Sequence, residues 1–316
     1  IRDRFMNTKE KVVVMGHRLP DADSFGAAIG IYRAAKTLNK KAYIVIDNPT
    51  SSIIPLMNTF RDNQDYEADM FVNNHEAKEI MDDNTLLVVV DTNKPSITQC
   101  EDLLYMAKMI VVLDHHRQGS DTIRNSVLSY IEPYASSASE MVAEILQYFT
   151  EGIRIRNVEA DSIYAGIMID TDNFMQKTGV RTFEAAAFLR RCGADVTRVR
   201  KLFREDMNDY KARGETIRNA ELFRGQFAIS ECPSDYVDSP TVVGAQAANE
   251  LLNIVGVKAS FVLTEYKGVI YISARAIDEV NVQIIMERMG GGGHLNMAGC
   301  QLETVDLELS LIHISE

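Results

Sequence analysis

The sequence predicts an α/β protein, in which a domain built on a parallel β-sheet with helices on both faces precedes a smaller mixed α/β C-terminal domain. Three observations lead to this fold class. Short β-branched runs alternate with helical patterns in the first half, which is typical of a parallel sheet covered by helices. The strand-like runs at 85–91 and 108–114 are apolar through their centres, as strands buried on both faces are. Strand-like and helical segments alternate again after residue 222.

The first domain is expected to span residues 1–195. Its strand-like runs and helical patterns follow one another in the order that a parallel sheet requires. Strands are predicted at 11–17, 41–47, 85–91 and 108–114, and helices at 24–40, 136–149, 158–170 and 181–193.

The charged segment 196–222 is helical by pattern and is predicted to connect the two domains. Residues 223–316 then form the second domain. Its strands are expected at 225–232, 258–276 and 300–304, and its helices at 242–255 and 280–289.

Composition narrows the possible functions. A length of 316 residues with 46% hydrophobic content is enough for two domains with separate cores. The net charge of -12 argues against binding to long nucleic acids, which usually needs a basic face. The four cysteines are widely separated, so neither a zinc knuckle nor a disulfide framework is expected.

We expect a soluble chain, because no run approaches about 18 apolar residues and the N-terminus lacks the apolar core of a signal peptide. The chain begins at Ile1 without a methionine. This start suggests a segment of a longer protein.

Acidic and histidine side chains collect where the predicted parallel strands end. His17 ends the first run and Asp91 another, while Asp114, His115 and His116 end a third. Taken singly, an aspartate after a strand is usually a turn former or a helix cap. Together these residues indicate a site, because the ligand crevice of an open α/β sheet lies at the carboxyl ends of its strands. Four of the six histidines fall in these motifs or in the glycine cluster at 290–299.

Two more aspartates, Asp21 and Asp23, sit in the loop after His17. Carboxylates mixed with imidazoles suit Mn²⁺ or Mg²⁺ better than zinc. Carboxylates also bridge, so several aspartates with few histidines indicate two adjacent metals. Two metals about 3.5–4 Å apart clamp the oxygens of a phosphoryl centre, which predicts phosphoester hydrolysis.

A second candidate site is the run "GGGGHLNMAG" at 290–299. Four glycines form either a flexible loop or a backbone cradle for phosphate; Gly291, Gly292 and Gly293 would line that cradle, with His294 at its edge. Ser273 and Arg275 lie two residues apart on a strand and hence on one face, where Arg275 could clamp a phosphate.

The stretch 181–204 is rich in basic residues. We expect a solvated helix face for all of them except Arg181. That residue follows the Asp170 segment closely and could face the crevice.

The motifs resemble those of a known superfamily. "GHRLPDADSFGAA" (16–28), "VVVDTNKP" (88–95), "VVLDHHR" (111–117) and "GIMIDTDNF" (166–174) resemble the four phosphoesterase motifs of the DHH superfamily, and "GGGGH" resembles the glycine motif of its associated C-terminal domain. Finer features resemble the GdpP or YybT branch of cyclic di-AMP phosphodiesterases: "YIEPYASSASEMV" (130–142), "KTGVRTFEAAAFLR" (177–190) and "ISARAIDEVNVQIIMERMGGGGHLN" (272–296).

The resemblance implies a DHH domain at 1–195, a substrate-binding DHH-associated domain at 223–316, and two Mn²⁺ ions per chain. It implies metal ligands as follows: His17 and Asp21 for one ion, Asp23, His115 and Asp170 for the other, and Asp91 as a bridge. It also implies that Asp114 orients the histidines. His116 would contact the scissile phosphate or protonate the leaving oxygen.

The resemblance further implies hydrolysis of cyclic di-AMP to linear 5′-pApA by an activated hydroxide. A nanoRNase-like or pApA-cleaving DHH enzyme remains the alternative, because it shares every metal ligand. The glycine run argues against a family II inorganic pyrophosphatase, and a sensor with a dead site would lack at least one ligand, whereas none is missing here.

Relatives of this branch carry the same module after membrane helices, a PAS domain and a degenerate GGDEF domain. We therefore expect a homodimer on the cytoplasmic side of a bacterial cell membrane, within an integral membrane protein whose spanning segments lie outside this chain. One departure from the pattern is Asp172, an extra carboxylate close to Asp170.

Overall fold

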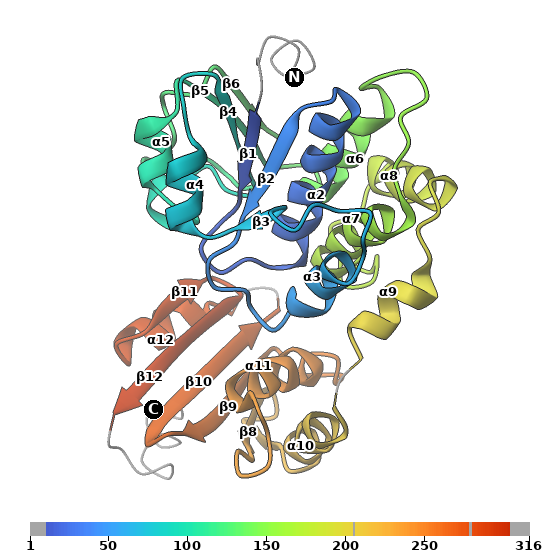
Figure 1. Cartoon of the computed structure of the whole chain (residues 1–316). Helices are drawn as coiled ribbons and strands as arrows, with labels where there is room; N and C mark the ends of the chain where they lie inside the picture. The colour runs from blue at the N-terminus through green and yellow to red at the C-terminus, as the bar shows by residue number, and fades with distance from the viewer. Residues whose placement is uncertain (1–10, 205, 278–279, 304–316) are drawn as a thin grey trace. The chain divides into compact units, whose positions relative to one another are not determined.

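The computed structural model describes residues 11–204, 206–277 and 280–303 (Figure 1). The chain divides into two compact units, Ile1–Arg204 and Glu205–Glu316. The division falls inside the segment 196–222 that the sequence predicts as a connector. Helix α9 (Val196–Leu202) packs in the first unit through buried Val199, whereas α10 (Met207–Arg218) packs in the second through Ala212.

The first unit contains a six-stranded sheet in the order β3-β2-β1-β4-β5-β6, with every neighbouring pair parallel. The four predicted strands are present, and two short strands at the edges, β3 and β6, were not predicted. The strands are β1 (Lys11–Met15), β2 (Lys41–Val45), β3 (Phe71–Val72), β4 (Thr85–Val90), β5 (Met109–Asp114) and β6 (Leu128–Ile131).

Helices cover both faces of this sheet, because alternate strand residues point to opposite sides (Figure 1). Val12 and Val14 of β1 pack with one set of helices: α2 (Ala22–Thr37), α3 (Ile54–Arg61), α6 (Ala138–Gln147), α7 (Asn157–Asp170) and α8 (Val180–Arg191). Val13 and Met15 pack with α4 (Asn74–Ile80) and α5 (Asp102–Met106). The predicted α/β class and parallel sheet are confirmed.

Two glycines let α2, α6 and α7 approach one another closely. A Cβ on Gly26 would lie 2.6 Å from the main-chain oxygen of Ser162, and a Cβ on Gly166 would lie 2.2 Å from Ser139 Oγ. Both distances are too short for a real side chain. This packing brings the N-terminal turns of α2 and α6 together, which matters for the site below.

The second unit is a mixed α/β domain, as predicted, and helices pack on both faces of its sheet. The strand order is β11-β12-β10-β9-β8-β7, in which only the β8–β9 pair is parallel. The strands are β7 (Glu221–Phe223), β8 (Phe227–Cys232), β9 (Ala259–Tyr266), β10 (Val269–Ala276), β11 (Gly292–His294) and β12 (Met297–Glu303).

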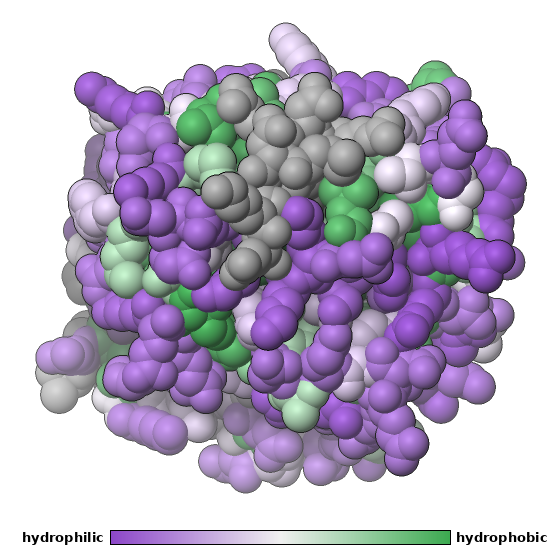
Figure 2. Space-filling view, turned by 45° about the horizontal axis from the view of Figure 1, so that its top comes forward, coloured by the Kyte–Doolittle hydropathy of each residue, from purple (hydrophilic) through white to green (hydrophobic). Residues whose placement is uncertain are grey.

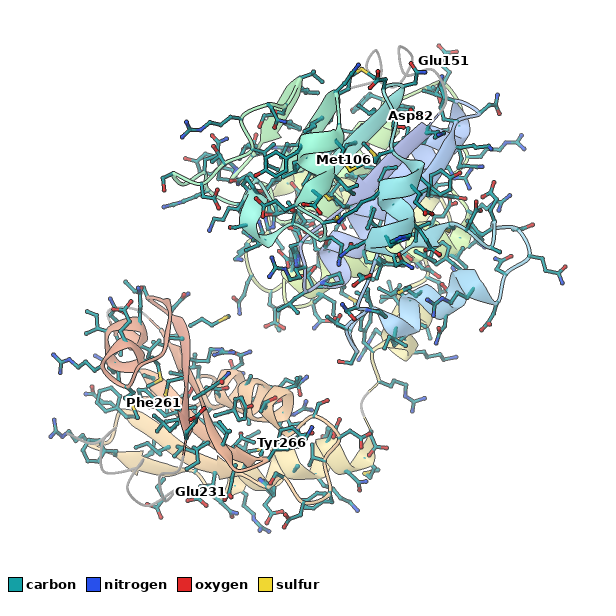
Figure 3. The ribbon with its side chains drawn as sticks, turned by 60° about the vertical axis from the view of Figure 1, so that its left-hand side comes forward. Asp82, Met106, Glu151, Glu231, Phe261 and Tyr266 are labelled. Atoms are coloured by element: carbon teal, nitrogen blue, oxygen red, sulfur yellow. The ribbon has the colours of Figure 1, made fainter. Side chains whose placement is uncertain are left out.

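Phe261 of β9 lies among the side chains inside this second unit (Figure 3). Helix α12 (Val282–Arg288) packs on that side of the sheet, while α10 and α11 (Pro240–Leu251) pack on the other.

The face drawn in Figure 2 is mostly hydrophilic and carries only small separate hydrophobic areas. Within the described ranges, none of the helices combines the length and the apolar character needed to cross a bilayer.

Candidate metal centre

The strand ends bring the predicted ligands to one edge of the first sheet. His17 follows β1, Asp91 follows β4, and His115 follows β5. The parallel register pairs Met15 with Val89, and Val90 with Leu113, so the three strands end side by side. This edge, where an open α/β sheet binds its ligand, therefore carries imidazoles and carboxylates.

Asp21 and Asp23 are placed by helix N-termini. Asp21 is the N-cap of α2, where its Oδ1 accepts a hydrogen bond from Ser24 N at 2.9 Å. Asp23 is 1% exposed, and its carboxylate accepts hydrogen bonds from Ala138 N at 2.7 Å and Ser139 N at 2.8 Å, at the start of α6. The cap function of Asp21 uses one oxygen and leaves the other facing His17.

The potential ligands form two groups, one of His17, Asp21 and Asp91 and one of Asp23, His115 and Asp170, and a third group of Asp91, His115 and His116 overlaps both. In the first group, His17 Nε2 lies 3.2 Å from Asp91 Oδ2 and 3.6 Å from Asp21 Oδ2. In the second, His115 Nε2 lies 3.6 Å from Asp170 Oδ2 and 3.7 Å from Asp23 Oδ2.

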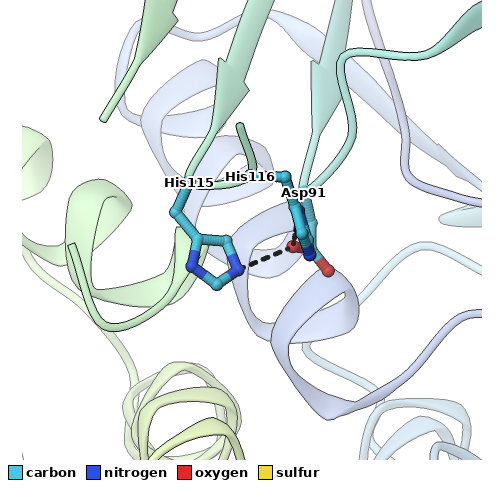
Figure 4. Close-up of side chains that lie close together, drawn as sticks. All are labelled: Asp91, His115 and His116. Carbon is cyan, nitrogen blue, oxygen red and sulfur yellow. Dashed lines mark ion pairs between the residues drawn. The ribbon is translucent and has the colours of Figure 1, made fainter. Parts of the chain in front are cut away.

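Asp91 directs one carboxylate oxygen toward each of the first two groups. Its Oδ2 faces His17, and its Oδ1 lies 3.4 Å from His115 Nε2 and 3.7 Å from His116 Nδ1 (Figure 4). Asp91 is 2% exposed and has a left-handed backbone with φ of 57°. Such strain costs free energy and persists where the surroundings require it. Within the described part of the chain, its buried Oδ1 makes no hydrogen bond.

The protonation equilibria of the cluster fit a cation-binding site. Burial disfavours the charged His17 ring, but hydrogen bonds to Asp21 and Asp91 outweigh it and raise the pKa of His17 to about 10. Burial raises the pKa of the Asp170 carboxyl to about 6. Burial, together with the charges of Asp91 and Asp170, also raises the pKa of Asp23.

The negative charges of four neighbouring carboxylates thus favour the protonated forms of the groups around them when no cation balances those charges. A divalent cation would balance the charge. The buried Oδ1 of Asp91, which makes no hydrogen bond among the described residues, would then gain a partner. The donor set of carboxylates and imidazoles suits Mn²⁺ or Mg²⁺.

His116 belongs to the third group, with Asp91 and His115. Its Nδ1 lies 2.8 Å from Asp114 Oδ1, and this hydrogen bond raises the pKa of the ring. The His116 side chain is 57% exposed, whereas Asp114 is fully buried. The ring is therefore accessible from solvent, which a role in proton transfer would require.

Arg181, predicted to face the crevice, is paired with carboxylates. Its Nε and Nη2 donate hydrogen bonds to both oxygens of Glu144, each at 2.7 Å, and its Nη1 lies 3.5 Å from Glu132. Two acidic residues therefore match its charge. A phosphate would have to compete with them.

The remaining predicted residues belong to the second unit. Ser273 and Arg275 share one face of β10, as the strand period predicts. Arg275 Nε donates a hydrogen bond to the neutral side chain of Asn249 at 2.8 Å, and no ion pair of Arg275 occurs among the described residues. Its Nη1 donates a second hydrogen bond to Ala274 O at 3.0 Å, so no carboxylate among the described residues matches the charge of the guanidinium.

The glycine run has a packing role as well. A Cβ on Gly291 would lie 2.2 Å from Gly299 O, and Gly293 has φ of 149° with 2.5 Å between such a Cβ and Met297 O. Gly292 has open space. The run was expected to form either a flexible loop or a backbone cradle; part of it forms β11, and Gly291 and Gly293 leave no room for a Cβ beside β12. The side chain of His294 lies outside the described part.

Two family models match the chain: DHH family, N-terminal domain, at residues 11–167, and DHHA1 domain at residues 227–314. The chain belongs to the DHH family. It is 43% identical over 306 residues to the cyclic-di-AMP phosphodiesterase GdpP of Bacillus subtilis (strain 168), covering 95% of this chain and 46% of that protein. The resemblance stated from the motifs is confirmed. The chain spans about half the length of the GdpP protein it matches.

A second relative is more distant. The bifunctional oligoribonuclease and PAP phosphatase NrnA of Thermus thermophilus is 25% identical over 96% of this chain and 88% of its own length. Among solved structures, an exopolyphosphatase-related protein from Bacteroides fragilis matches with a TM-score of 0.78 and 20% identity, covering 99% of this chain and 93% of that one. This last likeness supports the fold.

Proposed function

We propose that this chain hydrolyses cyclic di-AMP to linear 5′-pApA with two Mn²⁺ ions. The observation that carries the proposal is Asp91, whose two oxygens face two separate groups of ligands. His17, Asp21 and Asp91 would hold one ion. Asp23, His115 and Asp170, with the second oxygen of Asp91, would hold the other. The similarity to a cyclic-di-AMP phosphodiesterase supports the choice of substrate.

The residues have separate tasks in this mechanism. Bound divalent ions would neutralise phosphoryl charge and lower the pKa of a water molecule. The α6 N-terminus fixes Asp23, and the left-handed backbone orients Asp91 between the groups. His116 would protonate the leaving oxygen from its exposed ring.

In the second unit, we propose that the substrate contacts Ser273, Arg275, the backbone of Gly291, Gly292 and Gly293, and His294. The free charge of Arg275 supports its role as a phosphate ligand. Arg181 stays a prediction, because Glu144 and Glu132 already neutralise its charge.

We also propose a homodimer within a longer bacterial protein whose own segments attach it to the membrane, with this chain on the cytoplasmic side. The GdpP relative is about twice as long as this chain, which leaves room for such segments.

Metal stoichiometry tests the centre directly. After equilibration with Mn²⁺ and removal of free metal, elemental analysis is expected to give about two manganese per chain. The Asp91→Asn variant should bind less, because the residue faces both groups. A value near one in the unaltered protein would contradict the proposed shared carboxylate.

Substrate choice is tested by comparing initial rates on cyclic di-AMP and on pApA with Mn²⁺ present. We expect a clear preference for cyclic di-AMP. A nanoRNase-like enzyme is the second candidate, since the similarity to NrnA also covers nearly the whole chain. A clear preference for pApA would favour that candidate and contradict the proposal that cyclic di-AMP is the substrate.

A further inference from the structure

Asn93 connects the loop after β4 with the DHH motif. It lies two residues beyond Asp91 and is 2% exposed. Its Nδ2 donates a hydrogen bond to Asp114 Oδ2 at 2.5 Å and another to the main-chain oxygen of His116 at 3.3 Å. The main chain of Asn93 is itself anchored, because its oxygen accepts a hydrogen bond from Ile123 N at 2.9 Å.

Asp114 stands between Asn93 and His116. Its Oδ2 is bound by Asn93, and its Oδ1 accepts from His116 N at 3.1 Å and lies 2.8 Å from His116 Nδ1. An ionised carboxylate only accepts hydrogen bonds, so the hydrogen of a neutral His116 ring belongs on Nδ1. The opposite ring nitrogen, Nε2, then faces away from Asp114 and is the atom that takes up the proton which the protonated ring can donate.

The side-chain oxygen of Asn93 is in an unfavourable environment. Its Oδ1 is buried and makes no hydrogen bond within the described ranges. An unpaired buried oxygen is unfavourable, so an apolar residue of similar size would suit packing better. The donor atom Nδ2 is the part of the side chain that the structure uses.

We propose that Asn93 is a positioning residue for hydrolysis. By binding Asp114 Oδ2, Asn93 fixes the rotation of that carboxylate, and the carboxylate in turn fixes the tautomer and orientation of the His116 ring. The catalytic consequence rests on the proposed function, whereas the effect on the tautomer does not. Partners of this kind, which orient a group without touching substrate, commonly change activity by about 10–100-fold.

Three variants distinguish the hydrogen bond that Asn93 donates from the packing of the Asn93 side chain. Asn93→Leu keeps about the same size and removes the donor, while Asn93→Ala removes both. Thr98→Val is the matched control, because Thr98 is 1% exposed in the same loop and its Oγ1 donates to Pro95 O at 2.8 Å, away from Asp114. For each variant, kcat and KM are measured on cyclic di-AMP with Mn²⁺.

We expect both Asn93 variants to lower kcat about 10–100-fold with KM changed less than about 2-fold. Thr98→Val should leave kcat and KM unchanged. Survival of kcat in Asn93→Leu together with its loss in Asn93→Ala would show a packing role and overturn the proposal. Asn93→Ala is also made in the His116→Ala background, where a further loss of kcat contradicts action through His116.

The tautomer is read independently of activity. Ring ¹⁵N shifts of His116 are measured in Mg²⁺-loaded protein at alkaline pH, where the imidazole is neutral. We expect Nδ1–H in the unaltered protein and a mixture of tautomers in both Asn93 variants. Unchanged shifts in the variants would overturn the proposal. A failure of the unaltered chain to cleave cyclic di-AMP, with the expected shifts, would instead count against the proposed function alone.

Discussion

Replacing Asp91 by asparagine is expected to lower kcat/KM with Mn²⁺ by more than about 100-fold. Loss of a group that only supports a metal ligand commonly costs 10–100-fold, and Asp91 faces both ligand groups itself. Asparagine keeps the size and tolerates the left-handed backbone at this position. The loss therefore reports on the charge of the carboxylate, measured by initial rates over a Mn²⁺ series.

Asp172→Asn is the matched control. Asp172 is also left-handed, with φ of 47°, but it is exposed and faces Gln176, whose Nε2 lies 3.4 Å from its Oδ2. We expect this variant to keep kcat/KM within about 2-fold. Near-normal rates in Asp91→Asn would refute the shared-ligand role of Asp91, and an equal loss in both variants would point to general charge effects.

Replacing Glu159 by glutamine is expected to lower the free energy of unfolding by about 3–5 kcal/mol. Glu159 is fully buried, and Arg33 of α2 binds both of its carboxylate oxygens, with Nε to Oε2 at 2.7 Å. Tyr66 Oη donates to the same carboxylate at 3.0 Å, and Arg156 N donates at 2.9 Å. Glutamine keeps the shape but leaves the Arg33 charge, only 14% exposed, without its partner.

The control for this stability measurement is an exposed pair. Lys108 and Asp83 form a salt bridge with side chains 63% and 73% exposed. Asp83→Asn should cost less than about 1 kcal/mol, because water already solvates both charges. Urea unfolding followed by circular dichroism compares the two variants. A cost for Glu159→Gln no greater than that for Asp83→Asn would contradict the buried-pair explanation.

The sequence by itself determined the α/β class, the positions of the main strands along the chain and which residues are candidate ligands. These features depend on local patterns: apolar runs of strand length, helical periods, and polar residues placed where strands end. The edge strands β3 and β6 were missed, because segments of two and four residues carry too little periodicity.

Only the tertiary structure decided how the side chains meet. Asp23 is fixed by the α6 N-terminus, 115 residues away in the sequence. Arg181 donates hydrogen bonds to Glu144, and Asn93 donates one to Asp114; no local sequence pattern encodes these contacts. The direction of each Asp91 oxygen likewise follows from the shared edge of β1, β4 and β5. Such pairings arise because packing selects partners by distance in space, which spacing along the chain does not specify.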